Sequence, residues 1–351
     1  PARHEGVMQM AIKIGLVGYG VGGRLFHMPY IQASEQCVLA GVVTRSAERA
    51  AEVAEDAPGT PVASSLAELV DAGVDAVVIS TPPETRRALA LEAIARGVHV
   101  VADKPFAPSA EAGRELSDAA DRAGVLLNVF HNRRLDADIV TARRILDEGS
   151  LGAVQRLDLR CDQDDPATLE AGPTGGLLRD LGSHVIDQAL HLMGPAAFVS
   201  AQLDVRNLPA GPTDVAFTIA ILHENGSHSH VSSSKVNRLE SRELRLLGEH
   251  GSYVSDYRDV QIDAIRAGRR PGDDRETWGY EQPDRWGVLA VGADSTTVPS
   301  AQGDYTRFYD ALAEAIEDGG RGPVPAEQGI AVLRVLDAAR VSASERRTVA
   351  V

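Results

Sequence analysis

The stretch AIKIGLVGYGVGGRLFH, residues 11–27, decides the first half of the fold. It begins with an apolar run of strand length, which is typical of a parallel strand covered on both faces. Gly18, Gly20 and Gly23 follow with the spacing of a dinucleotide-binding turn. In such a turn the first glycine permits a tight bend, the second lets backbone N–H groups approach a pyrophosphate, and the third lets helix and strand pack closely. The N-terminus of the following helix would then hold the phosphates.

Strands and helices alternate from this turn to residue 130. Strand-like apolar segments are predicted at residues 12–17, 38–44, 61–63, 75–81, 98–105 and 125–130, with helical segments between them. This alternation predicts a doubly wound parallel sheet with right-handed crossovers. We therefore expect an α/β Rossmann domain over residues 10–130.

The second half has a different pattern. Predicted strands at 153–161, 198–206, 215–222, 228–236, 241–247 and 251–256 are accompanied by predicted helices at 136–148, 177–193, 305–318 and 326–345. Asn225-Gly226 between two alternating segments is a hairpin signal. The pattern predicts a C-terminal α+β domain over residues 131–351 with a large, mainly antiparallel sheet, and its last helices are candidates to pack back on the first domain. Residues 266–284 have the composition of a mobile connection.

Composition excludes several classes of partner. The chain has 351 residues, a formal charge of −15 and a pI near 5.1, which argue against nucleic acid and anionic membranes as partners. No apolar run approaches the ~18 residues of a membrane span, and the opening PARHEGVMQM has no apolar region of the signal-peptide kind. We expect a two-domain cytoplasmic protein with a small-molecule ligand.

Lysine is rare in this chain. Of 35 basic residues only Lys13, Lys104 and Lys235 are lysines. Lys104 follows the strand predicted at 98–105, and ligands of open α/β sheets lie beyond the carboxyl ends of the strands. Lys104 is therefore predicted to lie where a nicotinamide ring would be held, although a surface lysine after a strand is the alternative.

A second cluster lies on the helix predicted at 177–193. Asp180, His184, Asp187 and His191 recur at intervals of four, three and four residues, so one helical stripe carries all of them. A buried stripe of carboxylates and imidazoles requires partners. A solvated helix face and a zinc site are the alternatives, but apolar neighbours leave little of the helix for water, and no cysteine pair supports a metal.

These motifs resemble those of the glucose-fructose oxidoreductase and inositol dehydrogenase family, Gfo/Idh/MocA. The resemblance runs essentially end to end and is carried by Phe26-His27-x-Pro29, Thr81-Pro82, Asp103-Lys104-Pro105, Gly175-Gly176-x-x-x-Asp180-x-Gly182-x-His184-x-x-Asp187, Tyr305-x-x-Phe308-Tyr309 and Pro323-Val324-x-x-Glu327. The segment His131-Asn132-Arg133-Arg134 and the helix motif look most like the NADP-type scyllo-inositol dehydrogenase branch.

The resemblance implies specific site residues and an oligomer. The catalytic positions correspond to Lys104, Asp180 and His184, and the substrate positions to these three with Asn132 and Arg133. The cofactor positions, together with those from the glycine turn, are Gly18, Tyr19, Gly20, Gly22, Gly23, Arg24, Thr44, Arg45, Thr81, Pro82, Asp103 and Lys104. No metal is expected, and the exposed face of the antiparallel sheet is expected to pair with its copy in a homodimer or homotetramer.

The sequence departs from the family pattern at three places. Asp103 stands where a glutamate is usual, and Arg86 where many members have histidine. The segment 162–174 is short and acidic and lacks a Trp-Arg pair expected in the inositol branch. The last difference lies where substrate hydroxyls would bind, so it bears on the choice of substrate.

The second predicted strand ends in Thr44-Arg45-Ser46. NAD enzymes place a carboxylate at this turn for the adenosine ribose, whereas an arginine fork matches a 2′-phosphate. NADP is therefore the predicted cofactor, with NAD less favoured.

Together these features predict an NADP-dependent oxidoreductase. It would transfer hydride between the nicotinamide and a secondary alcohol or ketone carbon of a cyclic polyol or sugar, with His184 as acid–base group and Lys104 stabilising the alkoxide. A nucleotide-sensing regulatory protein of the same fold and a biosynthetic ketosugar reductase are the alternatives.

Overall fold

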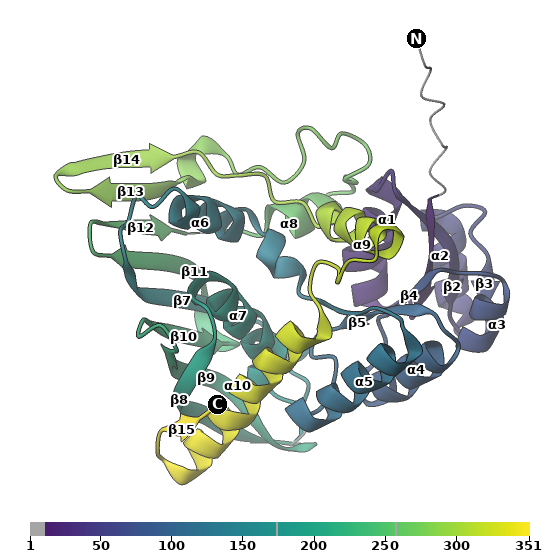
Figure 1. Ribbon diagram of the computed structural model, residues 1–351, viewed down its shortest axis with the longest axis horizontal. Coiled ribbons are helices and arrows are strands. Elements are labelled where there is room, and N and C mark those ends of the chain that lie inside the picture. The colour runs from purple at the N-terminus through teal and green to yellow at the C-terminus, as the bar shows by residue number, and fades with distance from the viewer. Residues whose placement is uncertain (1–10, 173–174, 257) are drawn as a thin grey trace.

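Two sheets with helices between them make up the molecule (Figure 1). The computed structural model describes residues 11–172, 175–256 and 258–351, so the opening decapeptide and the last two residues of the acidic segment, 173–174, lie outside the described residues.

The first sheet has six parallel strands in the order β3-β2-β1-β4-β5-β6. Its strands are β1 Ile12–Val17, β2 Cys37–Val43, β3 Val62–Ala63, β4 Ala76–Ile79, β5 His99–Asp103 and β6 Leu127–Phe130. Its helical segments are the π-helical η1 Gly22–His27, then α1 Met28–Ala33, α2 Ala47–Asp56, α3 Leu66–Asp71, α4 Pro83–Ala95 and α5 Ala110–Ala123. The doubly wound parallel sheet predicted from the alternation is confirmed.

The apolar runs explain why this sheet forms. Ile14, Leu16 and Val78 are fully buried, because helices cover both faces of the central strands. Ser46 and Ser65 begin α2 and α3, and each hydroxyl accepts a hydrogen bond from the backbone N–H three residues ahead. Local sequence therefore fixes both the strands and the helix starts.

The second sheet has nine strands in the order β14-β13-β12-β11-β7-β10-β9-β8-β15. Its strands are β7 Val154–Asp164, β8 Ala196–Leu208, β9 Gly211–His223, β10 His228–Ser234, β11 Val236–Gly248, β12 Gly251–Ser255, β13 Gly287–Val291, β14 Asp294–Val298 and β15 Val349–Ala350. The accompanying helical segments are η2 Asn132–Leu135, α6 Ala137–Asp147, η3 Pro166–Thr168, α7 Leu177–Met193, α8 Val260–Arg266, η4 Pro283–Arg285, α9 Thr306–Asp318 and α10 Ala326–Glu345. The sheet is mainly antiparallel, as predicted, with β10 parallel to β7.

Four elements were not predicted, namely α8 and the strands β13, β14 and β15, because they are short and β14 is largely exposed. The reading of 266–284 as a mobile connection is also wrong. Trp278 in this stretch is fully buried. Its ring packs edge-on against Tyr30 at 6.1 Å, and its indole N–H donates to Gln261 Oε1 at 3.1 Å.

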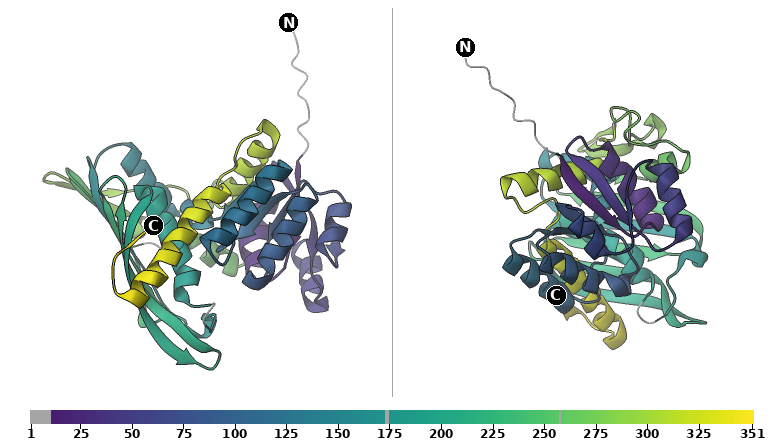
Figure 2. Two further views of the ribbon diagram at one scale, coloured as in Figure 1. Left: turned by 60° about the horizontal axis from the view of Figure 1, so that its bottom comes forward. Right: turned by 90° about the vertical axis from the view of Figure 1, so that its right-hand side faces the viewer.

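The two last helices join the sheets. The helix α10 packs against both α5 and β8, and α9 packs against α1, so the C-terminal chain returns to the first sheet (Figure 2). A Cβ on Gly329 of α10 would lie 2.6 Å from a methyl of Val129, so this close approach needs glycine. The carboxyl ends of the parallel strands thereby face the N-terminus of α7. None of the helices in the described ranges is long and apolar enough to cross a membrane.

Candidate active site

The glycine turn has the geometry that its spacing predicts. Gly18 has φ +99°, and a Cβ there would lie 2.3 Å from the Ser80 carbonyl oxygen. A Cβ on Gly23 would lie 2.3 Å from the Gly18 carbonyl oxygen, so this glycine is needed where helix and strand meet. A Cβ on Gly20 would meet nothing closer than 3.8 Å, which leaves its backbone open to a ligand.

A cleft of about 1090 Å³ runs over the carboxyl ends of β1, β2 and β4. Its lining includes Gly18, Tyr19, Gly20, Gly22, Thr44, Arg45, Thr81, Pro82 and Asp103 of the predicted cofactor residues. It also includes Ser46, which stands beside Arg45 in the predicted phosphate turn, and Arg49, Ser64 and Ser65, which were not predicted. A cradle of backbone amides with hydroxyls and guanidiniums at one end fits a nicotinamide dinucleotide.

Arg45 is the exposed cation at the end of β2. In the part of the chain that the structure describes, its side chain makes no hydrogen bond or ion pair. Arg49, one turn into α2, donates to the Tyr19 carbonyl and lines the same cleft. The helix α2 brings Arg49 to the end of the cleft where Arg45 lies. The signal for this in the sequence was the position of Arg49, four residues after Arg45.

Arg24 is held differently from the other predicted cofactor residues. Its guanidinium donates to Asp56 Oδ2 and Glu52 Oε1, both at 2.6 Å, and it is not among the residues lining the cleft. The Tyr19 hydroxyl donates to the same Asp56 at 2.9 Å. Arg24 therefore ties the glycine turn to α2, so its predicted contact with the cofactor has no support in this geometry.

Asp103 is part of a buried network that faces away from Lys104. Its Oδ1 lies 3.1 Å from His27 Nε2, its Oδ2 accepts from the Ser80 hydroxyl at 2.6 Å, and His27 Nδ1 lies 2.6 Å from the Tyr309 hydroxyl. Burial alone would raise the pKa of Asp103, but His27, Arg86 and Ser80 outweigh it and lower the pKa. The Asp103 carboxylate thus contacts His27 and Ser80 and not the Lys104 ammonium.

Arg86 anchors the segment that carries Lys104. Its guanidinium donates to the carbonyl oxygens of Lys104 at 2.9 Å and Pro105 at 3.1 Å, and its Nε donates to the Thr81 carbonyl oxygen at 2.8 Å. The Lys104-Pro105 peptide bond is cis. The arginine found in place of the usual histidine therefore fixes the backbone from which Lys104 projects.

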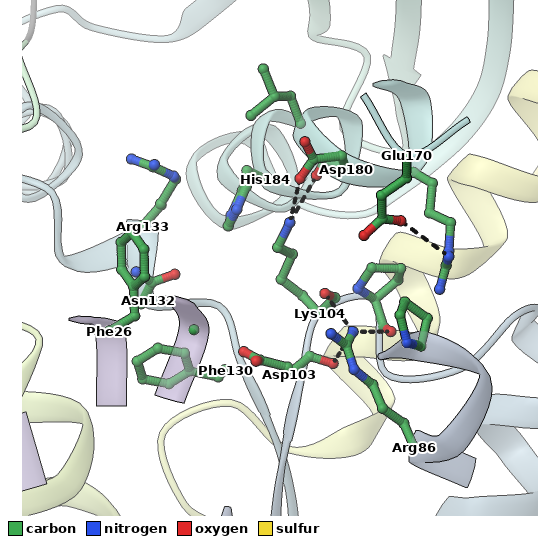
Figure 3. A pocket seen from close by; sticks show the side chains of 15 residues that line it. Phe26, Arg86, Asp103, Lys104, Phe130, Asn132, Arg133, Glu170, Asp180 and His184 are labelled. Carbon is green, nitrogen blue, oxygen red and sulfur yellow. Dashed lines mark hydrogen bonds and ion pairs between the residues drawn. The ribbon is translucent and has the colours of Figure 1, made fainter. Parts of the chain in front are cut away.

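Lys104 meets the N-terminal turn of α7 (Figure 3). Its Nζ lies 3.0 Å from Asp180 Oδ1 and 3.1 Å from the Asp180 carbonyl oxygen. The helix starts after Gly176, which has φ +95°, and Asp214 caps it by accepting from the Leu178 N–H at 2.6 Å. His184 lies one turn further along α7, beside the same lysine. The structure therefore brings the three predicted catalytic residues together.

These three side chains face a pocket of about 250 Å³ that adjoins the glycine cleft. Gly22, Arg86, Asp103 and Glu170 line both cavities. The predicted substrate residues Asn132 and Arg133 also line the pocket, and Arg133 is held by Asp259 at 2.8 Å. A ring bound here would lie between the catalytic trio and the cofactor cleft.

The protonation states follow from the surroundings. Burial would raise the pKa of Asp180, but Lys104 and Lys235 outweigh it and lower the pKa, so Asp180 is a carboxylate. Burial and the nearby Lys104 and Arg133 lower the pKa of His184 well below its ordinary value. His184 is therefore neutral at pH 7, and its buried Nδ1 has no partner within the described residues.

The rest of the polar stripe on α7 does not reach the pocket. Asp187 is buried in a two-pronged ion pair with Arg134, at 2.9 and 2.6 Å, and lies 3.8 Å from His131 Nε2. The stripe thus has two parts. Asp180 and His184 line the pocket, whereas Asp187 holds η2 against α7 through its ion pair with Arg134. Among the residues that the structure describes, no three His, Cys, Asp or Glu side chains are grouped to hold a metal ion.

Lys235 was not among the predicted site residues, but the fold brings it to the site. Its Nζ lies 2.8 Å from Asp180 Oδ2. The rarity of lysine in this chain was the available signal, but Lys235 and Asp180 are 55 positions apart and no local pattern pairs them.

The parallel sheet, the glycine cleft and the adjoining Lys-Asp-His pocket define a nicotinamide-dependent oxidoreductase. Comparison with known proteins agrees. The family described as "Oxidoreductase family, NAD-binding Rossmann fold" matches residues 12–131, and its companion "C-terminal alpha/beta domain" matches residues 143–351. The chain belongs to this Gfo/Idh/MocA family, as predicted from its motifs.

Two relatives and one solved structure illustrate the match. The chain is 34% identical to scyllo-inositol 2-dehydrogenase (NADP(+)) IolW of Bacillus subtilis, covering 96% of this chain and 95% of that protein. It is 26% identical to inositol 2-dehydrogenase of Rhizobium meliloti, covering 97% of this chain and 100% of that one. The structure of yvaA from Bacillus subtilis superposes with a TM-score of 0.89 at 33% identity, covering 98% of both chains. The prediction of an enzyme of the NAD(P)-dependent dehydrogenase class is confirmed.

Proposed function

We propose that this protein is an NADP-dependent dehydrogenase or reductase of a cyclic polyol or sugar with an inositol-like ring. The observation that carries the proposal is the Lys104–Asp180 ion pair beside neutral His184, in a pocket that adjoins the glycine cleft. The activities named for two of its relatives, scyllo-inositol 2-dehydrogenase (NADP(+)) and inositol 2-dehydrogenase, support this substrate class.

The bound cofactor would supply or accept the hydride at its nicotinamide ring. In the oxidation direction His184, being neutral, accepts the hydroxyl proton of the substrate. The Lys104 ammonium lies next to the same oxygen and stabilises the negative charge that develops on it. Asp180 holds this ammonium in place through Oδ1. Asn132 and Arg133, at the opposite wall, are proposed to bind ring hydroxyls.

The proposal of NADP rests on the end of β2. Arg45 is an exposed, unpartnered cation within the described part of the chain, with Thr44, Ser46 and Ser65 as hydroxyl donors around it. No carboxylate stands at this turn to repel a 2′-phosphate. A guanidinium fork with several hydroxyls matches a phosphate group in geometry and charge.

Turnover assays test the proposal. The purified protein is mixed with NADPH or NADH and a panel of inososes and ketosugars, and the nicotinamide absorbance is followed. We expect turnover of inososes with NADPH. Turnover restricted to open-chain ketosugars would favour a ketosugar reductase instead, and tight NADPH binding with no turnover of any member would favour a sensor.

We also propose that the outer face of the nine-stranded sheet pairs with a second copy of the chain. Phe198 of β8 and Leu222 of β9 are cross-strand neighbours, and their exposed fractions are 46% and 44%. Mass photometry should show a dimer or tetramer, and Phe198→Glu should shift the population toward the monomer.

A further inference from the structure

Lys235 lies at the junction between β10 and β11. Its N–H donates to the Val215 carbonyl oxygen at 3.1 Å, and its carbonyl oxygen accepts from the Asp165 N–H at 3.2 Å. Only 4% of the residue is exposed. The backbone is therefore fixed by two neighbouring segments, and the side chain runs inward to the start of α7.

The Lys235 ammonium has two partners at the site. Its Nζ lies 2.8 Å from Asp180 Oδ2 and donates to the Thr168 carbonyl oxygen at 3.3 Å. Lys104 occupies the other carboxylate oxygen, Oδ1, at 3.0 Å. Asp180 is thus held by a separate lysine at each oxygen, which removes its freedom to rotate.

The charges of this trio do not cancel. Two ammonium groups share one carboxylate, so a net positive charge remains beside the pocket. If Lys104 and Asp180 formed the pair alone, their charges would cancel, and an alkoxide would meet a neutral ion pair. A lysine as buried as Lys235 also needs its carboxylate, since an unpaired buried ammonium is costly.

We propose that Lys235 is a positioning residue for the hydride-transfer site: it locks Asp180 so that Oδ1 faces Lys104, and it leaves the site with a net positive charge. This inference rests on the proposed function. The competing explanation is purely structural, in which Lys235 only ties the segment containing Thr168 to the sheet.

A double-mutant cycle separates these explanations. Lys235→Met should lower kcat/KM about 10- to 100-fold. This is at or slightly below the loss found when one electrostatically stabilising group is removed from an active site. In the Asp180→Asn background the same change should cost several-fold less, because only the charge of Lys235 is then lost and there is no carboxylate for it to hold. Lys235→Arg, which keeps the charge, should recover part of the activity, and Lys13→Met, at an exposed lysine of β1, is the matched control.

Losses of equal size in both backgrounds would overturn the proposal, and so would an unchanged kcat/KM in Lys235→Met. If Lys235→Met fails to fold, judged by circular dichroism, Lys235→Gln takes its place in the cycle. Its amide keeps a hydrogen-bonding group near Asp180 but removes the charge.

A carboxyl titration tests the same idea without turnover. Protein labelled with carboxyl ¹³C aspartate is titrated by NMR, and the Asp180 signal is assigned by its loss in Asp180→Asn. Lys235 is one of the two groups that lower the pKa of Asp180, so Lys235→Met should move the midpoint upward and Lys235→Arg should not. An unmoved midpoint in Lys235→Met overturns the inference. If the wild type turns over no polyol, the proposed function fails, while this titration still decides whether Lys235 stabilises the charge on Asp180.

Discussion

The cofactor cleft and the catalytic pocket are built in different ways. The cleft is made largely by short stretches of sequence, namely the glycine turn and the ends of β1, β2 and β4. The pocket is made by side chains that meet across long separations, such as Lys104 with Asp180, 76 positions apart, and Arg133 with Asp259, 126 apart. Substitutions in the pocket should therefore affect turnover, and those in the cleft should affect cofactor affinity.

The largest expected effect is in the pocket. Lys104→Met should lower kcat by about 10²-fold or more, because the developing alkoxide loses its adjacent positive charge. The dissociation constant of NADPH should change little, since the lysine ammonium points toward α7 rather than along the cleft. Steady-state kinetics and cofactor titration measure the two quantities, with Lys13→Met as control. A near-normal kcat would exclude the assigned role.

His184→Asn should reduce activity on a comparable scale and change its pH dependence. The pKa of His184 is lowered well below 6.5 by burial first and then by Lys104 and Arg133. The neutral base is thus present at pH 7, and kcat/KM for oxidation should fall only as the pH drops through that low pKa. For reduction, which needs the protonated form, kcat/KM should rise as the pH falls. Profiles of both directions that stay unchanged in His184→Asn would assign the proton transfer to another group.

Arg45→Ala tests whether the cleft determines cofactor affinity. Hydrogen bonds to charged groups contribute about 1.5–3 kcal/mol, so NADPH binding should weaken about 10- to 150-fold. NADH has no 2′-phosphate for Arg45 to contact, and its affinity should hardly change. Arg87→Ala, at an exposed arginine of α4 paired with Glu115, is the matched control. Equal weakening of both cofactors, or a wild type that prefers NADH, would contradict NADP specificity.

This contrast also explains which parts of the fold and of the site could be predicted from the sequence. Apolar strand segments, their alternation with helices and the glycine spacing predicted the first sheet and its turn, because these signals act over a few residues. The catalytic trio came from a resemblance, since no local pattern joins Lys104 to α7. Lys235 was missed for the same reason, and β13 and β14 were missed because strands of five residues carry little periodicity.

The smallest expected effect concerns Arg24. Its local sequence predicts a contact with the cofactor, whereas its tertiary contacts are with α2. Its place in the glycine turn predicts cofactor contact, but its guanidinium is engaged by Asp56 and Glu52 of α2. Asp56 is well shielded from solvent, so the ion pair should stabilise the fold by about 1 kcal/mol. Arg24→Ala should therefore lower the free energy of unfolding by about that amount, while NADPH affinity changes less than about twofold. Urea unfolding and cofactor titration measure the two effects. A tenfold loss of NADPH affinity at unchanged stability would restore Arg24 to the cofactor site and show that this part of the cleft rearranges on binding.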